Sequence, residues 1–448
     1  MNFQSFFKDK KVTVLRIGLL GRGIGDTRYM AEAGAEVTVV DAADQVVMQP
    51  AVDALSEFPN VQFKFGPYDF TDFKEADFVL VGAGTPIEEP VLAQCRENGI
   101  ALKQSAALFA ELTDVPIIGV TGTRGKSTVT HMIHHVLQTV TDGEVLLGGN
   151  VRNVSNLQLL NDVQEDSLAV MELDSWQLQG WGWAKKSPLI AVFTNFMEDH
   201  LNYYQKEGMT KEDAMQLYFA DKANIFRFQD ESGVFVTVPE VFERAKSLEG
   251  VSLGQEVVLA DDSVLPEDML LSMPGEHNRL NAGLAYSALK AVSLSPEEIF
   301  HGLATFPGVP GRLEYLGERQ DVKIYNDNNS TTPQATIQGL RAVGNSEDKN
   351  VILIAGGSYK SLDPMPMIEE IQKYCKQVVL LPGAGTDMIK DEVEATVATD
   401  MAEAVTTAME NGLPGDVLLF SPGFASFGLF KNEYERNDAF VECVNKYE

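Results

Sequence analysis

A glycine-rich turn between two apolar segments constrains this chain more than any other feature. The turn reads Gly-Val-Thr-Gly-Thr-Arg-Gly-Lys-Ser-Thr from residue 119 to residue 128. The apolar run at 115–118 predicts a buried strand before it, and the pattern at 129–140 predicts a helix after it. A strand, a glycine turn and a helix N-terminus together direct backbone N–H groups at a phosphate chain. The pattern therefore predicts ATP binding, with an ordinary glycine-rich turn as the alternative.

The end of this turn carries the expected chemistry. Lys126 is expected to reach the terminal phosphates of the nucleotide, and the Ser127 hydroxyl is expected to bind Mg²⁺. The spacing departs from the common G-x-x-x-x-G-K-[ST] pattern, because position 120 is Val and the glycines fall at 119, 122 and 125.

Composition narrows the possible classes of protein. The chain has 448 residues, enough for about three domains of ordinary size. Its longest apolar runs, such as 351–355, are too short to span a bilayer, and the first ten residues lack the apolar core of a signal peptide. Three scattered cysteines show no metal-binding spacing, and a net charge of −30 argues against a nucleic-acid partner. We therefore expect a cytoplasmic protein without a membrane segment.

Residues 1–112 alternate between strand and helix patterns. Strands are expected at 11–19, 36–40, 61–65 and 77–81, which indicates a doubly wound fold with a parallel sheet. The first strand–helix turn contains Gly18, Gly21, Gly23 and Gly25, and Asp41 ends the second strand. This arrangement is similar to a dinucleotide fingerprint, but a full G-x-G-x-x-G is missing. From these residues alone, NAD and another nucleotide-like ligand both remain open.

The rest of the chain divides into two further α/β segments, predicted at 113–308 and 309–448. The breaker sequence Pro-Gly-Val-Pro at 307–310 marks the boundary between them. The second segment is expected to hold strands at 168–173 and 189–194 and helices at 209–228 and 282–292. The third is expected to hold strands at 351–355, 377–381 and 417–420. The predicted fold class is thus α/β in three domains, Rossmann-like at both ends, with a P-loop-type central domain.

Polar side chains end two neighbouring strands of the central segment. Glu172 ends one predicted strand, and 195–200 follows the next one and finishes with His200. A parallel sheet presents such side chains to a ligand at its carboxyl edge. Beside a phosphate-binding turn, carboxylate oxygens suggest Mg²⁺ ligands.

Two other patterns have weaker implications. The helical spacing of His131, His134 and His135 could form a metal-binding face, although a solvated or half-buried helix face is the favoured interpretation. In the third segment, glycine turns at 356–360 and 421–426 follow predicted strands. Together these two turns could form an anion pocket, and separately each could be a plain loop.

Taken in order, these motifs resemble the Mur ligase family of ATP-dependent amide-forming enzymes in peptidoglycan synthesis. The sequence 121–128 stands where that family has its ATP loop, and 148–150, 172–178 and 195–200 match the next three motifs in order and spacing. The sequence Ala-Asp-Lys-Ala-Asn-Ile-Phe at 220–226 is similar to the site of the family's carbamylated lysine, at Lys222. Further similar motifs lie at 277–281, 311–312 and 325–327.

The resemblance implies a role for each motif. A UDP group would bind residues 1–112, ATP would bind 113–308, and the incoming amino acid would bind 309–448. The first glycine turn would then hold UDP and not NAD. The implied catalytic residues are Lys126, Asn150, His200 and Lys222, and the implied magnesium ligands are Ser127, Glu172, His200 and the Lys222 carbamate. The implied nucleotide ligands are Gly122, Thr123, Arg124, Gly125, Lys126, Ser127, Thr128, Asn278, Asn281, Arg312 and Asp327. The implied substrate ligands are Gly21, Gly23, Asp41, Thr331, Lys360 and Ser426.

The implied reaction adds an amino acid, expected to be D-glutamate, to UDP-N-acetylmuramoyl-L-alanine through an acyl phosphate, by an enzyme expected to be a monomer. Three departures leave the amino acid open. The sequence Asn-Asp-Asn-Asn-Ser-Thr at 326–331 lacks a basic residue usual in this branch, and 41–44 lacks the usual hydroxyl and basic groups. Glu433 falls where the family often has an aromatic residue, although a shift of one residue would place Tyr434 there. The alternatives are another Mur-type ligase, a folate-type glutamate ligase or a silent nucleotide-sugar-binding relative.

Overall fold

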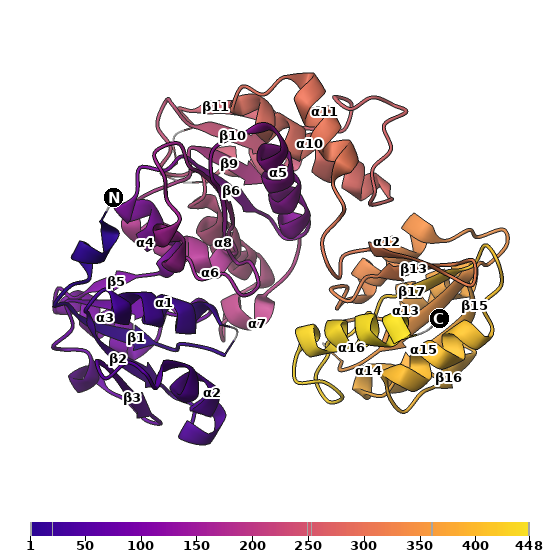
Figure 1. The fold of residues 1–448 in the computed structure, drawn as a ribbon, viewed down its shortest axis with the longest axis horizontal. Helices are drawn as coiled ribbons and strands as arrows, with labels where there is room; N and C mark the ends of the chain where they lie inside the picture. The colour runs from indigo at the N-terminus through magenta and orange to yellow at the C-terminus, as the bar shows by residue number, and fades with distance from the viewer. Residues whose placement is uncertain (1, 20, 249, 252, 360–361, 447–448) are drawn as a thin grey trace. The chain divides into compact units, whose positions relative to one another are not determined.

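The computed structural model describes residues 2–19, 21–248, 250–251, 253–359 and 362–446. Three sheets with flanking helices confirm the predicted α/β class (Figure 1). The chain divides into two compact units, one of residues 1–265 with 281–302 and the other of residues 266–280 with 303–448. One sheet lies within each predicted domain, but the domain limits themselves stay a prediction.

The first sheet is parallel, with strand order β3-β2-β1-β4-β5. Its strands are β1 (Lys11–Leu15), β2 (Glu36–Asp41), β3 (Val61–Phe65), β4 (Phe78–Val81) and β5 (Ala101–Lys103). Its helices are η1 (Phe3–Phe6), α1 (Arg22–Glu32), α2 (Gln45–Leu55), η2 (Phe70–Asp72), α3 (Pro90–Glu97) and α4 (Ser105–Leu112). The strand predicted at 11–19 ends at Leu15, because Arg16 takes a left-handed backbone with a φ of 59°. The chain therefore turns toward α1 earlier than the apolar pattern indicates.

The second sheet is also parallel, with strand order β11-β10-β9-β6-β8-β7. Its strands are β6 (Ile117–Thr121), β7 (Val145–Gly149), β8 (Leu168–Glu172), β9 (Ile190–Phe193), β10 (Val234–Thr237) and β11 (Glu256–Leu259). The helices of this part are α5 (Lys126–Val140), η3 (Gln158–Asn161), α6 (Ser175–Ala184), α7 (Leu201–Tyr204), α8 (Lys211–Ala223), α9 (Pro239–Lys246), α10 (Glu276–Ala291) and α11 (Pro296–Thr305). Every residue of β6 is buried, and α5 packs on β6, β7 and β8. The glycine turn thus joins a core strand to the start of a core helix.

Side-chain caps set the starts of the helices that approach this turn. The Asp174 carboxylate accepts the Gln177 N–H at 2.8 Å and caps α6. Thr210 and Asp213 form a capping box that starts α8, which is shorter than the helix predicted at 209–228. Asp174 therefore has a local structural role, because its side chain satisfies a free N–H at the helix end.

The third sheet has strand order β12-β13-β17-β14-β15-β16, and only the β12–β13 pair is antiparallel. Its strands are β12 (Glu314–Arg319), β13 (Val322–Asn326), β14 (Val351–Gly356), β15 (Cys375–Leu381), β16 (Ala395–Val397) and β17 (Val417–Phe420). Its helices are α12 (Pro333–Val343), α13 (Met365–Tyr374), α14 (Ala384–Asp387), α15 (Met401–Glu410) and α16 (Glu433–Lys446). Ile352 and Ile354 pack into one core, and Leu353 packs into the core on the opposite face. Helices cover both faces, so this strand is apolar throughout.

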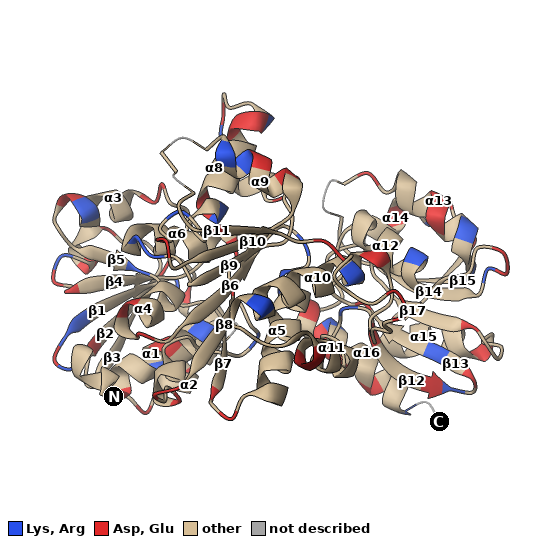
Figure 2. Ribbon diagram, turned by 90° about the horizontal axis from the view of Figure 1, so that it is seen from above, with Lys and Arg blue, Asp and Glu red and all other residues tan. Residues whose placement is uncertain are grey.

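Charged side chains of both signs are distributed over the helices and loops of each unit (Figure 2). Among the helices of the described ranges, none combines the length and the apolar character that a bilayer crossing needs.

Close packing of α1 on β1 depends on Gly23. A Cβ atom added at this glycine would lie 2.0 Å from the carbonyl oxygen of Ile17. We predict that Gly23→Ala lowers the stability of the first unit by about 1–3 kcal/mol, because the backbone must move to relieve the overlap. Urea unfolding measures this, and Gly254→Ala is the control, because a Cβ there meets open space. Equal midpoints for the two variants would contradict the close approach.

Candidate functional site

The glycine turn after β6 is held in place by the end of β9. The Thr123 N–H donates to the Asn195 carbonyl at 2.9 Å, and the Arg124 N–H donates to Asn195 Oδ1 at the same distance. Gly122 and Gly125 have φ values of 147° and 80°, which other residues rarely adopt. A side chain at Gly122 would also overlap Thr194. The backbone of this turn is therefore fixed before any ligand binds.

Two lysines converge on one carbonyl oxygen of this turn. Lys126, the first residue of α5, donates from Nζ to the Gly122 carbonyl at 2.9 Å. Lys222, on α8, donates to the same carbonyl at 2.8 Å and to Thr121 Oγ1 at 3.3 Å. Its side chain is fully buried, and burial, followed by the nearby charge of Lys126, lowers the pKa of Lys222 well below its usual value. An amine in this position favours its neutral form.

The predicted acidic and histidine residues lie at the carboxyl ends of neighbouring strands. Glu172 ends β8, is buried, and accepts a hydrogen bond from Asn150 Nδ2 at 3.3 Å. His200 follows β9 with a left-handed φ of 54°, and its ring lies 4.8 Å from that of Trp176. Burial lowers the pKa of His200, although the Asp199 carboxylate opposes this shift. The neutral imidazole is therefore available as a ligand near neutral pH.

The donor set fits a hard cation that keeps other oxygen ligands. No group of three or more His, Cys, Asp or Glu side chains that could enclose a metal ion occurs among the described residues. Glu172 supplies a buried carboxylate, and Ser127, at the start of α5, supplies a hydroxyl. Mg²⁺ commonly binds through one or two protein oxygens together with phosphates and water. The residues present fit that mode better than an all-protein cage.

Two of the three histidines of α5 contact backbone carbonyls. His131 Nδ1 lies 2.8 Å from the Ser127 carbonyl oxygen, and His134 Nε2 lies 3.0 Å from that of Val145. Each of these contacts engages one ring nitrogen, and both side chains are half-buried. These contacts support the favoured interpretation of a partly buried helix face.

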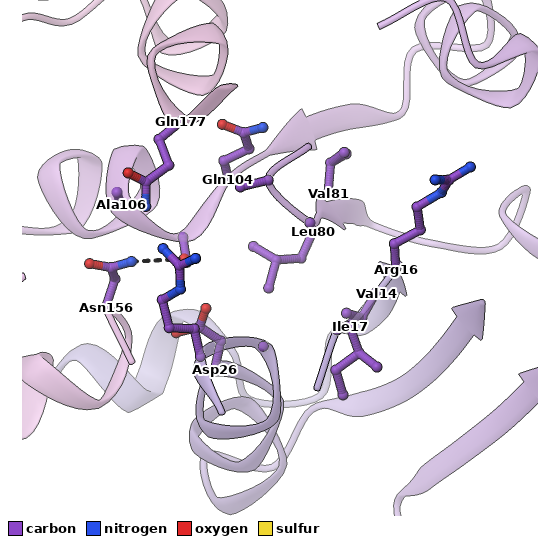
Figure 3. A pocket seen from close by; sticks show the side chains of 16 residues that line it. Val14, Arg16, Ile17, Asp26, Leu80, Val81, Gln104, Ala106, Asn156 and Gln177 are labelled. Carbon is purple, nitrogen blue, oxygen red and sulfur yellow. Dashed lines mark hydrogen bonds between the residues drawn. The ribbon is translucent and has the colours of Figure 1, made fainter. Parts of the chain in front are cut away.

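A cavity of about 160 Å³ lies beside the glycine turn that follows β1 (Figure 3). Of the three predicted substrate residues of this part, Gly23 lines the cavity and Gly21 is the N-cap residue of α1. Asp41 ends β2, and its side chain accepts the Ala43 N–H at 3.1 Å. Their role as substrate residues stays a prediction. Several polar lining residues were missed by the sequence analysis, namely Arg16, Arg22, Asp26, Gln104, Ser105, Asn156 and Gln177. The signal that could have identified two of them is a pair of arginines flanking the first glycine turn of an acidic chain.

Asp26 joins the first sheet's helices to the second sheet's loops at this cavity. Its carboxylate is fully buried and accepts the Ser155 hydroxyl at 2.6 Å and the Leu157 N–H at 3.0 Å. Burial raises its pKa, while the two hydrogen bonds oppose the increase. Arg22 also crosses this junction, donating to the Gly149 carbonyl at 3.5 Å. The cavity wall therefore combines residues around the first sheet with Asn156 and Gln177, from a loop and a helix beside the second sheet.

In the second unit, predicted ligand residues gather where parallel strands end. Asp327 follows β13, and its carboxylate accepts the hydroxyls of Ser330 at 2.5 Å and Ser421 at 2.8 Å. The two glycine turns pair with each other, since Ser358 and Ala425 form an antiparallel bridge. Thr331 and the buried Ser426 lie on these loops, whereas Lys360 falls outside the described residues. Whether they bind an anion stays a prediction.

Asn328, within the departing sequence 326–331, is held by a buried arginine. Arg436 on α16 is fully buried and donates to Asn328 Oδ1 at 2.8 Å, to the Asn328 carbonyl at 2.9 Å and to the Phe424 carbonyl at 3.0 Å. Asn328 Nδ2 in turn donates to the Glu433 carbonyl at 2.9 Å. The asparagine thus joins the loop after β13 to the start of α16.

Three further predicted nucleotide residues are Asn278 and Asn281, on α10, and Arg312, just before β12. Asn281 lies beside the glycine turn at 119–128, which we call the phosphate turn. A Cβ atom added at Gly125 would lie 2.5 Å from Asn281 Oδ1. Asn278, on the same helix, donates to the Pro274 carbonyl at 2.9 Å. Arg312 precedes β12, and its N–H donates to the Val309 carbonyl at 3.0 Å.

The fold and site define an α/β nucleotide-binding protein with a phosphate turn and a buried lysine beside it. The middle-domain model of the Mur ligases matches residues 120–242, and the model described as "Mur ligase, glutamate ligase domain" matches 311–424. A UDP-N-acetylmuramoylalanine–D-glutamate ligase of Roseiflexus sp. (strain RS-1) is 30% identical, over 98% of this chain and 99% of that protein. The chain belongs to the Mur ligase family.

Solved structures share the fold at low identity. A UDP-N-acetylmuramate-alanine ligase from Thermotoga maritima gives a TM-score of 0.61 at 17% identity, covering 98% of this chain and 100% of its own. A MurF ligase from the same organism, solved in complex with ADP, gives 0.59 at 14% identity, covering 99% of this chain and 96% of its own. The fold of this chain is therefore similar to the folds of these two ligases over nearly their full lengths.

Burial of Asp327 should make the stability of the second unit depend on pH. Burial raises the pKa of this carboxyl to about 6, against the hydrogen bonds from Ser330 and Ser421. The folded state thus holds a proton that the unfolded state releases between about pH 4 and 6, so the stability from this group is present at low pH and lost as pH rises. Relative to Asp327→Asn, the wild type should lose on the order of 3 kcal/mol between pH 4 and 7.

Hydrogen exchange of the β13 and β17 amides at several pH values measures this difference within the second unit. The prediction would be contradicted if the wild type became more stable relative to Asp327→Asn as the pH rises.

Proposed function

We propose that this protein is an ATP-dependent ligase that joins D-glutamate to UDP-N-acetylmuramoyl-L-alanine through an acyl phosphate. The observation that carries the proposal is near-full-length similarity to ligases named for this reaction, 30% identical over 98% of the chain in the Roseiflexus protein. The phosphate turn with its two converging lysines supports it independently. The proposed division of labour is 1–112 for the UDP group, 113–308 for ATP and 309–448 for the amino acid.

The proposed ATP site uses the turn after β6. Backbone N–H groups of Gly125 to Thr128 at the start of α5 would hold the phosphates, since the Thr123 and Arg124 N–H groups already donate to Asn195. Lys126 would move its ammonium from the Gly122 carbonyl to the terminal phosphate. Asn281 is proposed to contact the nucleotide because it lies beside Gly125. ADP in the related MurF structure supports nucleotide use by this fold. Asn278, Arg312 and Asp327 remain predicted nucleotide residues.

Magnesium is proposed to bind Glu172, Ser127 and His200. When bound, Mg²⁺ would neutralise charge on the phosphates and on the carboxylate that accepts phosphate. Lys222 is proposed to carry a carbamate, because its low pKa leaves a nucleophilic amine that can react with carbon dioxide. A carbamate would replace a buried cation with an anionic oxygen ligand.

The cavity beside β1 is proposed to hold the UDP-sugar diphosphate. Arg16 and Arg22 line it, and Arg16 Nε is buried without a hydrogen-bond partner. A guanidinium binds phosphate oxygens with paired donors and keeps its charge at all relevant pH values. Gly21, Gly23 and Asp41 stay proposed substrate residues of the same domain.

The proposed chemistry makes a poor acyl donor reactive. The γ-phosphoryl group of ATP moves to an oxygen of the L-alanine carboxylate, and ADP leaves. The amino group of the incoming amino acid then attacks the acyl carbon, and phosphate leaves from the tetrahedral intermediate. Lys126 would stabilise charge on the transferring group, while Asn150 and His200 would orient the acyl group. Because the reaction uses ATP and a UDP-sugar, we propose that it takes place in the cytoplasm. We also propose that the enzyme is a monomer.

The proposed amino-acid ligands are Thr331, Ser426 and Lys360. One observation favours a second candidate, a Mur-type ligase that adds a different amino acid. Asn329 stands where a basic residue is usual in this branch, and it donates from Nδ2 to the Pro310 carbonyl at 3.3 Å. A carboxylate of the amino acid would then lack one cation.

The direct test is phosphate release from ATP with UDP-N-acetylmuramoyl-L-alanine and a panel of D- and L-amino acids. We expect release to depend on both substrates and to be fastest with D-glutamate, with L-glutamate as the stereochemical control. Faster release with another amino acid would favour the second candidate, and no release with any of them would refute the ligase proposal.

The UDP-sugar cavity predicts a specific effect of Arg22→Ala. Loss of a charge-assisted hydrogen bond of roughly 1.5–3 kcal/mol should raise the KM for the UDP-sugar about ten-fold or more, with little change in kcat. Arg28→Ala is the matched control on the same helix, because Arg28 pairs with Glu57 at 2.9 Å, away from the cavity lining. An unchanged KM in Arg22→Ala would remove this arginine from the proposed site.

A further inference from the structure

We propose that Tyr203, Gln179 and Asp221 form a positioning network that couples occupancy of the UDP-sugar cavity to nucleotide binding at the phosphate turn. The inference rests on the proposed function for the identity of the two ligands. All three residues belong to the first compact unit.

One end of the network reaches the cavity wall. The Tyr203 hydroxyl, on α7, donates to the Thr85 carbonyl at 3.1 Å. The Thr85 hydroxyl donates to the Gly82 carbonyl at 2.7 Å, and Gly82 lines the cavity. A ligand that moves the loop after β4 therefore moves the acceptor of the Tyr203 hydrogen bond.

Gln179, in the middle of the network, is buried, and the chemistry of its partners determines which group donates each hydrogen bond. Gln179 Nε2, on α6, donates to the Tyr203 hydroxyl oxygen at 3.2 Å and to Asp221 Oδ2 at 2.8 Å. Since the Tyr203 proton goes to Thr85, its oxygen can only accept from Gln179. Gln179 is 3% exposed, so an unmade bond would leave a buried amide without a partner, which is costly. The three side chains therefore tend to move together.

The other end reaches the phosphate turn along α8. Asp221 is followed directly by Lys222, whose Nζ donates to the Gly122 carbonyl at 2.8 Å. Helix α8 packs against α6 and α7, and the three helices lie near one another in Figure 1. A second contact runs through rings, because Trp176 lies 5.6 Å from the Tyr203 ring and 4.8 Å from the His200 ring, centroid to centroid. Both routes end at residues of the proposed ATP site.

The adjacent Tyr204 provides a matched comparison. Its hydroxyl donates to the same carboxylate oxygen, Asp221 Oδ2, at 2.9 Å. It stabilises Asp221 without joining the loop after β4. Loss of this hydroxyl should therefore change nucleotide affinity equally with and without the UDP-sugar.

The experiment measures coupling directly. The Kd of a non-hydrolysable ATP analogue with Mg²⁺ is determined by calorimetry, with and without saturating UDP-N-acetylmuramoyl-L-alanine, for wild type, Tyr203→Phe, Gln179→Met, the double variant and Tyr204→Phe. We expect wild-type Kd values to differ about five-fold or more between the two conditions, the ratio to fall toward one in Tyr203→Phe and Gln179→Met, and no further fall in the double variant. Tyr204→Phe should keep the wild-type ratio.

The outcomes separate the network from the proposed function. A wild-type ratio of one, or a wild-type ratio retained in Tyr203→Phe, would overturn the network. An equal loss of the ratio in Tyr204→Phe would also overturn it, because that result indicates a general weakening around Asp221. Failure of the UDP-sugar itself to bind the wild type would instead refute the proposed function. Thermal unfolding of each variant confirms that the compared proteins are folded.

Discussion

The arrangement around the phosphate turn depends on a buried amine. Lys222 donates to the Gly122 carbonyl, which also accepts from Lys126, so two ammonium groups would meet at one oxygen. A fully buried cation beside another cation is unfavourable unless one of them loses its charge. The low pKa of Lys222 follows from this placement. The glycine conformations of the turn and the cap that starts α8 hold the amine there, and the proposed carbamate is the chemical use of it.

The sequence allowed the central features of the fold to be predicted, because core strands in parallel sheets are continuous apolar runs. The strands at 61–65 and 417–420 have the predicted limits, and the phosphate turn joins a strand and a helix as expected. Strands β5, β7, β10, β11, β12, β13 and β16 were not predicted. Of these, β5, β11 and β16 are short sheet-edge strands with mixed side chains and a weak pattern, whereas β10 and β13 lie inside their sheets. The sequence shows local periodicity but not which edge a short segment joins.

The site was predictable where motifs are contiguous and not where it is assembled from distant segments. Lys126, Glu172 and His200 follow strands of one sheet, so strand order alone brings them to one edge. The cavity beside β1 combines Arg22 and Asp26 with Gln104 and Gln177, which no spacing rule connects. The first two sheets belong to one compact unit. Asn328 is similar, since its partner Arg436 lies over one hundred residues away.

The central claim concerns the chemical state of Lys222, and carbon-13 NMR of the protein equilibrated with ¹³C-labelled bicarbonate tests it most directly. We predict a carbamate carbon signal that is present in the wild type, absent in Lys222→Ala and retained in Lys211→Ala, which removes an exposed lysine of the same helix that pairs with Glu198. A wild-type spectrum without a carbamate signal, or a signal that persists in Lys222→Ala, would contradict the account.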